Sequence, residues 1–144
     1  MSTANILTTL MKDHQDLAHM FDRALATTDG TKRKALYDKI KEALVAHTRF
    51  EEEHLYPVLA EKNGTKEGSV EALEEHAVIK DLLSDISSTD VMDDHWNAKM
   101  TVLSENVHHH VREEEQKNGL FDDLRKILDE ETLVSLAEEY LVTK

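Results

Sequence analysis

Six side chains in this sequence have the types and the spacing that metal binding requires. Two histidines are each followed four residues later by a glutamate, so each pair lies on one helix face, one turn apart. A further histidine precedes each pair, by 33 residues in the first half of the chain and by 34 in the second. Imidazole and carboxylate groups together suit transition metals. The six candidate ligands are His14, His47, Glu51, His76, His110 and Glu114.

The four histidines continue apolar stripes of helical period. Val107 precedes His110 by three residues, and Val70 and Leu73 lead to His76 in the same way. Because such a stripe faces the core of a bundle, each of four helices is expected to point a histidine into the interior. The local text also repeats, as HTRFEEE in the first half and HVREEEQ in the second. This repeat predicts two similar helix pairs.

The elements that carry these residues are expected to be helices throughout. The chain has one proline and four glycines, and 33% of its residues are charged, which favours an all-α domain. The pattern predicts an antiparallel up-down-up-down four-helix bundle with short C-terminal helices. We expect one domain over residues 1–144, with a core bundle over about 4–118 and a C-terminal extension over about 120–142. The predicted long helices cover about 4–26, 32–61, 69–87 and 91–118.

Capping and breaking residues set the expected helix boundaries. Ser2 or Thr3 is predicted to cap the first helix, and the TTDGT segment is predicted to be a turn. KNGTKEG, residues 62–68, reads as a loop before a third helix that Ser69 caps. Pro57 is expected to kink the second helix, because proline removes one backbone hydrogen bond. Asn118 and Gly119 are expected to interrupt or end the fourth.

Composition excludes several classes of site and disfavours several partners. With no cysteine among 144 residues, disulfides, iron–sulfur clusters and thiolate zinc sites are excluded. The net charge of −13 disfavours nucleic acid and anionic lipid as partners. No apolar run approaches the roughly 20 residues that a membrane span needs, and the N-terminus does not resemble a signal peptide. We therefore expect a cytoplasmic protein, a monomer or a dimer.

The six candidate ligands indicate two metal ions rather than one. A buried carboxylate is strongly unfavourable unless a cation or hydrogen bonds compensate it. Six ligands are too many for one tetrahedral zinc, and imidazoles argue against magnesium and calcium. Iron fits this donor set, whereas manganese and zinc fit it less specifically. We expect two iron ions, each bound by two histidines, with both glutamates and an oxo or hydroxo group as bridges.

Each part of the pattern also has a purely structural interpretation. A single histidine on an apolar stripe is often a hydrogen-bonded core residue, and glutamate runs are usually solvated. His54, Tyr37 and Tyr56 stay open as further donors near the site, since no spacing requires them. The remaining histidines are expected at the surface; they are His19, His95, His108 and His109.

The pattern resembles the hemerythrin-like, or HHE cation-binding, family over residues 4 to about 125. The matching text is DH at 13–14, HTRFEE with a following LYP at 47–57, EH at 75–76 and HVREEE at 110–115. The resemblance implies a left-handed four-helix bundle around a non-haem di-iron centre that binds dioxygen or its reduced forms. It carries over the same ligands, namely His14, His47, Glu51, His76, His110 and Glu114.

Two positions depart from the oxygen-carrying members of that family. Lys80 stands where those members have a fifth histidine, and Glu115 stands where they have an aspartate ligand, so that Glu114 is the favoured ligand here. Reversible oxygen carriage is therefore less expected than reaction with dioxygen or peroxide. Oxygen or iron storage, or iron or redox sensing without turnover, is the alternative. The ferritin-like arrangement is disfavoured because it uses Glu-x-x-His, and the sequence names no electron donor and decides no enzymatic activity.

Overall fold

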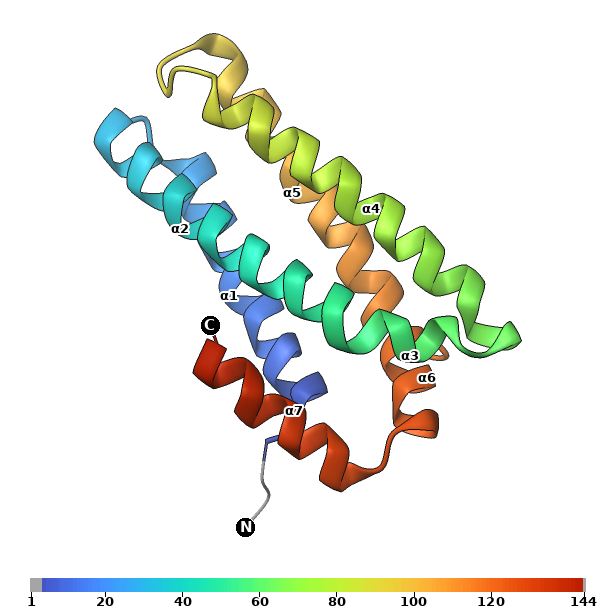
Figure 1. Cartoon of the computed structure of the whole chain (residues 1–144). Coiled ribbons are helices and arrows are strands. Elements are labelled where there is room, and N and C mark those ends of the chain that lie inside the picture. The colour runs from blue at the N-terminus through green and yellow to red at the C-terminus, as the bar shows by residue number, and fades with distance from the viewer. Residues whose placement is uncertain (1–3, 144) are drawn as a thin grey trace.

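Residues 4–143 are described by a computed structural model, and their regular secondary structure is helical. Four long helices form an antiparallel bundle, with the shorter helices at one end of it (Figure 1). This confirms the predicted all-α bundle with short C-terminal helices. The long helices are α1 (Ile6–Ala26), α2 (Gly30–Phe50), α4 (Asn63–Ser87) and α5 (Asp94–Glu115). The shorter elements are the π-helix η1 (Glu51–Leu55), α3 (Tyr56–Ala60), α6 (Leu120–Ile127) and α7 (Glu130–Thr143).

Helix α1 begins at a capping box. The Asn5 side chain accepts a hydrogen bond from the Thr8 backbone N–H at 3.0 Å, and the Asn5 backbone N–H donates to the Thr8 hydroxyl at 3.2 Å. The caps predicted from the sequence, Ser2 and Thr3, lie outside the described residues. Asn5 caps the helix because it directly precedes the first helical residue and its short side chain reaches the third residue of the helix.

The loop predicted over residues 62–68 is wrong, because α4 already begins at Asn63. Ser69 is therefore not a cap. It is buried inside the helix, where its hydroxyl donates to the Lys66 carbonyl at 2.7 Å. Gly68 lies where a Cβ atom would approach the Leu120 side chain of α6 to 3.0 Å. Close packing against α6 thus outweighs the low helix propensity of glycine here.

The apolar stripe predicted for the third helix is also wrong in its first turns. Val70 and Leu73 are 48% and 42% exposed, whereas Ser69 and Ala72 are buried. The inward face of α4 is made of small residues at this end, which lets α3 and α6 pack closely against it. The stripe is as predicted from His76 onward.

The kink predicted at Pro57 is instead a change of helix type just before it. Residues Glu51–Leu55 form a π-helix, and the Tyr56 N–H bonds to the Glu51 carbonyl five residues earlier. Pro57 then stands in the first turn of α3, where no hydrogen bond within that helix requires a backbone N–H. The wider π turn brings Tyr56 close to the helix face that carries Glu51.

The core has two parts, one on each side of the buried histidines. One part fills the bundle toward the α2–α1 and α4–α5 turns and includes Trp96 and Met100. The other fills the end covered by α6 and α7 and includes Phe121 and Tyr140. No helix within residues 4–143 has both the length and the apolar character of a membrane span.

The turn between α5 and α6 aims Phe121 into the bundle. Asn118 has a positive φ of 62°, and a side chain at position 119 would collide with the carbonyl oxygen of Glu113. Glycine is therefore required at this position. The predicted interruption at Asn118 and Gly119 is confirmed, and α6 folds back toward the candidate ligands.

Candidate metal centre

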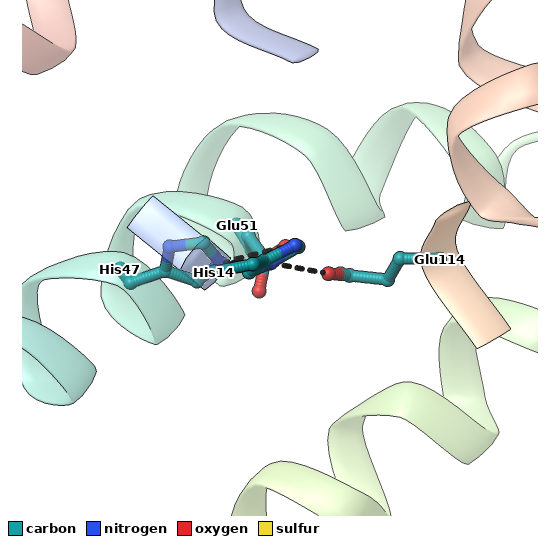
Figure 2. Close-up of side chains that lie close together, drawn as sticks. All are labelled: His14, His47, Glu51 and Glu114. Atoms are coloured by element: carbon teal, nitrogen blue, oxygen red, sulfur yellow. Dashed lines mark hydrogen bonds and ion pairs between the residues drawn. The ribbon is translucent and has the colours of Figure 1, made fainter. Parts of the chain in front are cut away.

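The structure brings all six candidate ligands together in the interior of the bundle. Each long helix contributes one histidine, and the two glutamates come from the start of η1 and the end of α5. Glu51, His76 and Glu114 are fully buried, and the other three histidines are at most 6% exposed. Figure 2 shows four of the six side chains meeting from three directions.

The first half of the cluster is built around His14 and His47. Their Nε2 atoms lie 3.2 Å apart. The Oε1 atom of Glu114 is 3.3 Å from Nε2 of His14, and the Oε2 atom of Glu51 is 3.4 Å from Nε2 of His47 (Figure 2). Two nitrogens and two carboxylate oxygens therefore face one small volume.

The second half is built around His76 and His110 in the same way. Their Nε2 atoms lie 3.0 Å apart. The Oε1 atom of Glu51 is 3.2 Å from Nε2 of His76, and the Oε2 atom of Glu114 is 3.2 Å from Nε2 of His110. Each glutamate thus presents one oxygen to each histidine pair.

These donors fit a pair of metal ions. Two nitrogens that bind one ion at about 2.1 Å lie roughly 3.0–3.4 Å apart for angles between 90° and the tetrahedral angle. Both histidine pairs have this separation. The Oε2 atom of Glu51 and the Oε1 atom of Glu114 are buried and accept no hydrogen bond. A buried carboxylate oxygen without a donor is costly, and a cation between the two pairs would compensate it.

A carboxylate from a neighbouring helix orients each of the four imidazoles. In every case the Nδ1–H donates to the carboxylate, which turns Nε2 toward the centre, where it can bind an ion once it carries no proton. Each carboxylate directly adjoins a candidate ligand in the sequence and contacts a histidine on the next element around the bundle. The four contacts are His14 with Glu115, His47 with Asp13 at 3.3 Å, His76 with Glu52 at 2.8 Å, and His110 with Glu75 at 2.7 Å.

Without a cation, protons on His47 and His110 offset buried carboxylate charge. Burial lowers the pKa of His47, but the charge of Glu51 and the hydrogen bond to Asp13 raise it to about 10. Burial also lowers the pKa of His110, but the charge of Glu114 raises it well above its usual value. Burial raises the pKa of Glu51, but the His47 charge and hydrogen bonds lower it well below the usual range.

Tyr56 is a further polar residue in the cluster, one that spacing alone did not single out. Its hydroxyl donates to Oε2 of Glu114 at 2.9 Å, and Oε1 of Glu51 lies 3.2 Å from the same phenol oxygen. The same oxygen lies 3.1 Å from Nε2 of His110 and 3.2 Å from Nε2 of His76. Burial and the two carboxylates raise the pKa of this phenol well above 10, so it stays protonated beside them. The phenol oxygen therefore belongs to the second half of the cluster.

The other residues considered from the sequence lie outside the cluster. His54 is partly exposed, packs on the ring of Phe50 and faces Glu139 of α7 at 3.7 Å. Lys80 forms an ion pair with Glu52 at 3.2 Å instead of facing the centre. Tyr37 donates to the Leu83 carbonyl, toward the opposite end of the bundle.

One surface depression reaches the cluster. It lies between α1 and α5, has a volume of about 180 Å³ and is bordered by His14, Glu115 and apolar residues that include Phe21 and Val107. On the other side of His14, the ring of Phe121 stacks nearly parallel to the imidazole, with 5.9 Å between the ring centroids. A small molecule in this depression would therefore lie against His14 and Glu115, at the edge of the cluster.

A four-helix bundle with this buried histidine and glutamate cluster is a metal-binding bundle. The model of the Hemerythrin HHE cation binding domain matches residues 5–119, so the chain belongs to that family. The solved structure of a hemerythrin HHE cation binding domain-containing protein from Mycobacterium kansasii superposes with a TM-score of 0.82 at 20% identity, covering 97% of this chain and 85% of that one. This likeness shows the fold.

A curated relative extends beyond the length of this chain. A protein described as a DNA nickase, from Nostoc sp. strain PCC 7120, is 29% identical over 141 residues. The match covers 97% of this chain but only 39% of the nickase. The chain thus spans about two fifths of that relative.

Proposed function

We propose that this protein binds two iron ions and that the resulting centre binds or reacts with dioxygen or hydrogen peroxide. The observation that carries the proposal is the position of the two buried glutamates, each with one oxygen toward each histidine pair. His14 and His47 would hold one ion, and His76 and His110 the other. Glu51 and Glu114 would bridge them. Iron suits mixed imidazole and carboxylate donors, whereas manganese and zinc suit them less specifically.

Bound iron would supply Lewis acidity and a store of electrons. The chain's own residues orient the donors, exclude water and hold protons. Glu51 and Glu114 neutralise part of the metal charge in a dry interior. The Tyr56 hydroxyl lies within 2.9–3.2 Å of donors in the second half of the cluster, so its oxygen could serve as a further donor to an ion held there.

The size of the access route favours a diatomic or similarly small ligand. The depression of about 180 Å³ between α1 and α5 borders His14, and its walls are partly apolar. Dioxygen and hydrogen peroxide are small and carry no charge, which suits a depression of this size. DNA is disfavoured as a substrate of this chain, because a net charge of −13 repels a phosphate backbone.

Anaerobic iron loading followed by exposure to air tests the proposal. Wild-type protein should bind two ferrous ions per chain and then develop a charge-transfer band in the near ultraviolet. Hydrogen peroxide added afterwards should be consumed. The double variant Glu51→Ala/Glu114→Ala is the control and should show none of these changes. Two bound irons with a spectrum that neither air nor peroxide alters would refute the redox function.

The same experiment separates turnover from storage or sensing. A band that appears with dioxygen and disappears when the gas is removed, without peroxide consumption, indicates a binding module. Continuous loss of peroxide at a constant protein concentration indicates an enzyme.

A further inference from the structure

The C-terminal helix α7 packs across α1, the helix that carries His14 (Figure 1). Its inward residues follow a helical spacing of four and three. They enter the same core cluster as the first two turns of α1. These residues are Leu133, Ala137 and Tyr140.

Tyr140 connects α7 to one of the candidate ligands. Its hydroxyl donates to Oδ2 of Asp13, and the same carboxylate oxygen accepts from Nδ1 of His47 at 3.3 Å. Burial and the neighbouring Asp13 raise the pKa of Tyr140, so the hydroxyl keeps its proton and donates. The phenol ring packs on Phe50, one residue before η1, with the ring centroids 4.9 Å apart. The chain of contacts therefore runs from α7 through α1 to α2.

Asp13 differs from the three other carboxylates that orient a histidine. The other three are glutamates, whose side chains are 17–29% exposed. The Asp13 side chain is only 11% exposed and is one methylene shorter. A short buried carboxylate depends on protein donors rather than water to hold its orientation. Tyr140 supplies such a donor on the same oxygen that contacts His47.

We infer that Tyr140 is a positioning residue of the metal centre, acting through Asp13 to hold His47 in its metal-binding orientation. This inference rests on the metal binding proposed above. Tyr140 lies beyond residues 5–119, the part that the family model matches. On this assignment, α7 belongs to the metal centre and does more than cover the end of the bundle. Groups that orient a histidine ligand typically change metal affinity by 10–100-fold when they are removed.

Metal titration of Tyr140→Phe tests this role. The substitution removes only the hydroxyl and keeps the buried ring. Metal-free full-length chain is titrated anaerobically with Co²⁺, whose visible spectrum reports the geometry of its ligands. Wild type should bind two ions. The variant should bind one of them 10–100-fold more weakly, with an altered spectrum for that ion, and the other within twofold of wild type.

Tyr37→Phe is the matched control. Tyr37 is also buried, and its hydroxyl donates to the Leu83 carbonyl at 2.5 Å, away from the cluster. This variant should bind both ions as wild type does, even where the melting temperature of its metal-free form falls. Wild-type affinity and spectrum for both ions in Tyr140→Phe would overturn the inference. A wild type that binds no metal would instead overturn the proposed function.

Hydrogen exchange of the wild-type chain decides the matter should Tyr140→Phe not fold. Because linkage is reciprocal, metal bound at His47 should tighten the docking of α7. Amides of residues 130–143 are expected to exchange more slowly with Co²⁺ bound than without it. Exchange in α7 that metal leaves unchanged, while the buried amides around His47 become protected, would contradict the inference.

Discussion

The His14–His47 pair and the His76–His110 pair have closely similar inner contacts and different outer ones. In both pairs the Nε2 atoms lie 3.0–3.2 Å apart, and each pair faces one oxygen of Glu51. Every Nδ1 atom in both pairs also meets a carboxylate. This likeness follows from the repeat in the sequence, since each half of the chain supplies a histidine and then a His-x-x-x-Glu pair.

The difference lies in the residues that surround the pairs. Tyr56 places a hydroxyl beside His76 and His110. It follows Glu51 by five residues, whereas the residue five after Glu114 is Gly119. The other pair instead meets the ring of Phe121, stacked on His14, and the surface depression.

Two equivalent sets of donors therefore need not be equally accessible. The repeated segments build two similar sets of donors. The π-helix and the C-terminal helices, which have no counterpart in the other half, make those positions different. We therefore expect the small ligand to approach the His14–His47 side.

Removal of both bridging carboxylates should have the largest effect, because it breaks both halves at once. Glu51→Ala/Glu114→Ala is expected to lower the affinity for iron by more than about a thousandfold at both positions, since each ion loses two of its donors. Elemental analysis after anaerobic loading measures the change. A single variant at either glutamate should lower the affinity for both ions. A double variant that still holds two irons would contradict the bridging role.

Metal affinity should rise with pH at both histidine pairs. The pKa of His47 is raised to about 10 and that of His110 is raised well above its usual value, so both rings are protonated at neutral pH without metal. Each ion must displace such a proton, which predicts about a tenfold gain in affinity per pH unit for each proton released. The pKa of Glu51 is lowered, so this carboxylate releases none near neutral pH.

Calorimetry in two buffers with different ionisation heats measures those protons directly. We expect at least one proton released for each ion between pH 6 and pH 8. An apparent binding heat that is the same in both buffers would show that the rings are already neutral in the metal-free protein.

Tyr56→Phe should weaken metal binding at the His76–His110 pair and leave the other pair nearly unchanged. It removes the one hydroxyl that distinguishes the His76–His110 side, so affinity there is expected to fall about tenfold while the other position stays within twofold. The ferric form should also lose visible absorbance that depends on the phenol oxygen. Spectra of the iron-loaded variant provide the measurement, with Tyr37→Phe as the control. An equal loss at both positions would remove the proposed asymmetry.

Lys80→Ala should have the smallest effect. Lys80 forms a largely exposed ion pair with Glu52, which in turn contacts His76. Exposed ion pairs contribute about 0–1 kcal/mol, so metal affinity is expected to change by no more than about fivefold. Titration of the variant beside wild type is sufficient. A change of a hundredfold would mean that Lys80 orients the centre through Glu52.

Most of the fold could be predicted from local patterns, and the errors share one physical cause. The stripe from His76 onward, the four long helices and the break at Asn118 and Gly119 all follow from helical period and backbone chemistry. The loop predicted over 62–68 was wrong because propensity counts the glycines against a helix. Packing of Leu120 against Gly68 favours a helix at this place. That contact joins distant segments, so it is not visible in the local sequence pattern.

The sequence by itself determined which six polar side chains would meet in the interior, because their spacing matches the period of the helices that carry them. Only the tertiary structure decided the surroundings of those six. Tyr56 approaches Glu51 because a π-helix, not an α-helix, joins them. Asp13 and Tyr140 meet, although 127 residues separate them, because α7 packs on α1. Helical period governs neighbours a few residues apart, whereas contacts between distant segments depend on how whole helices pack.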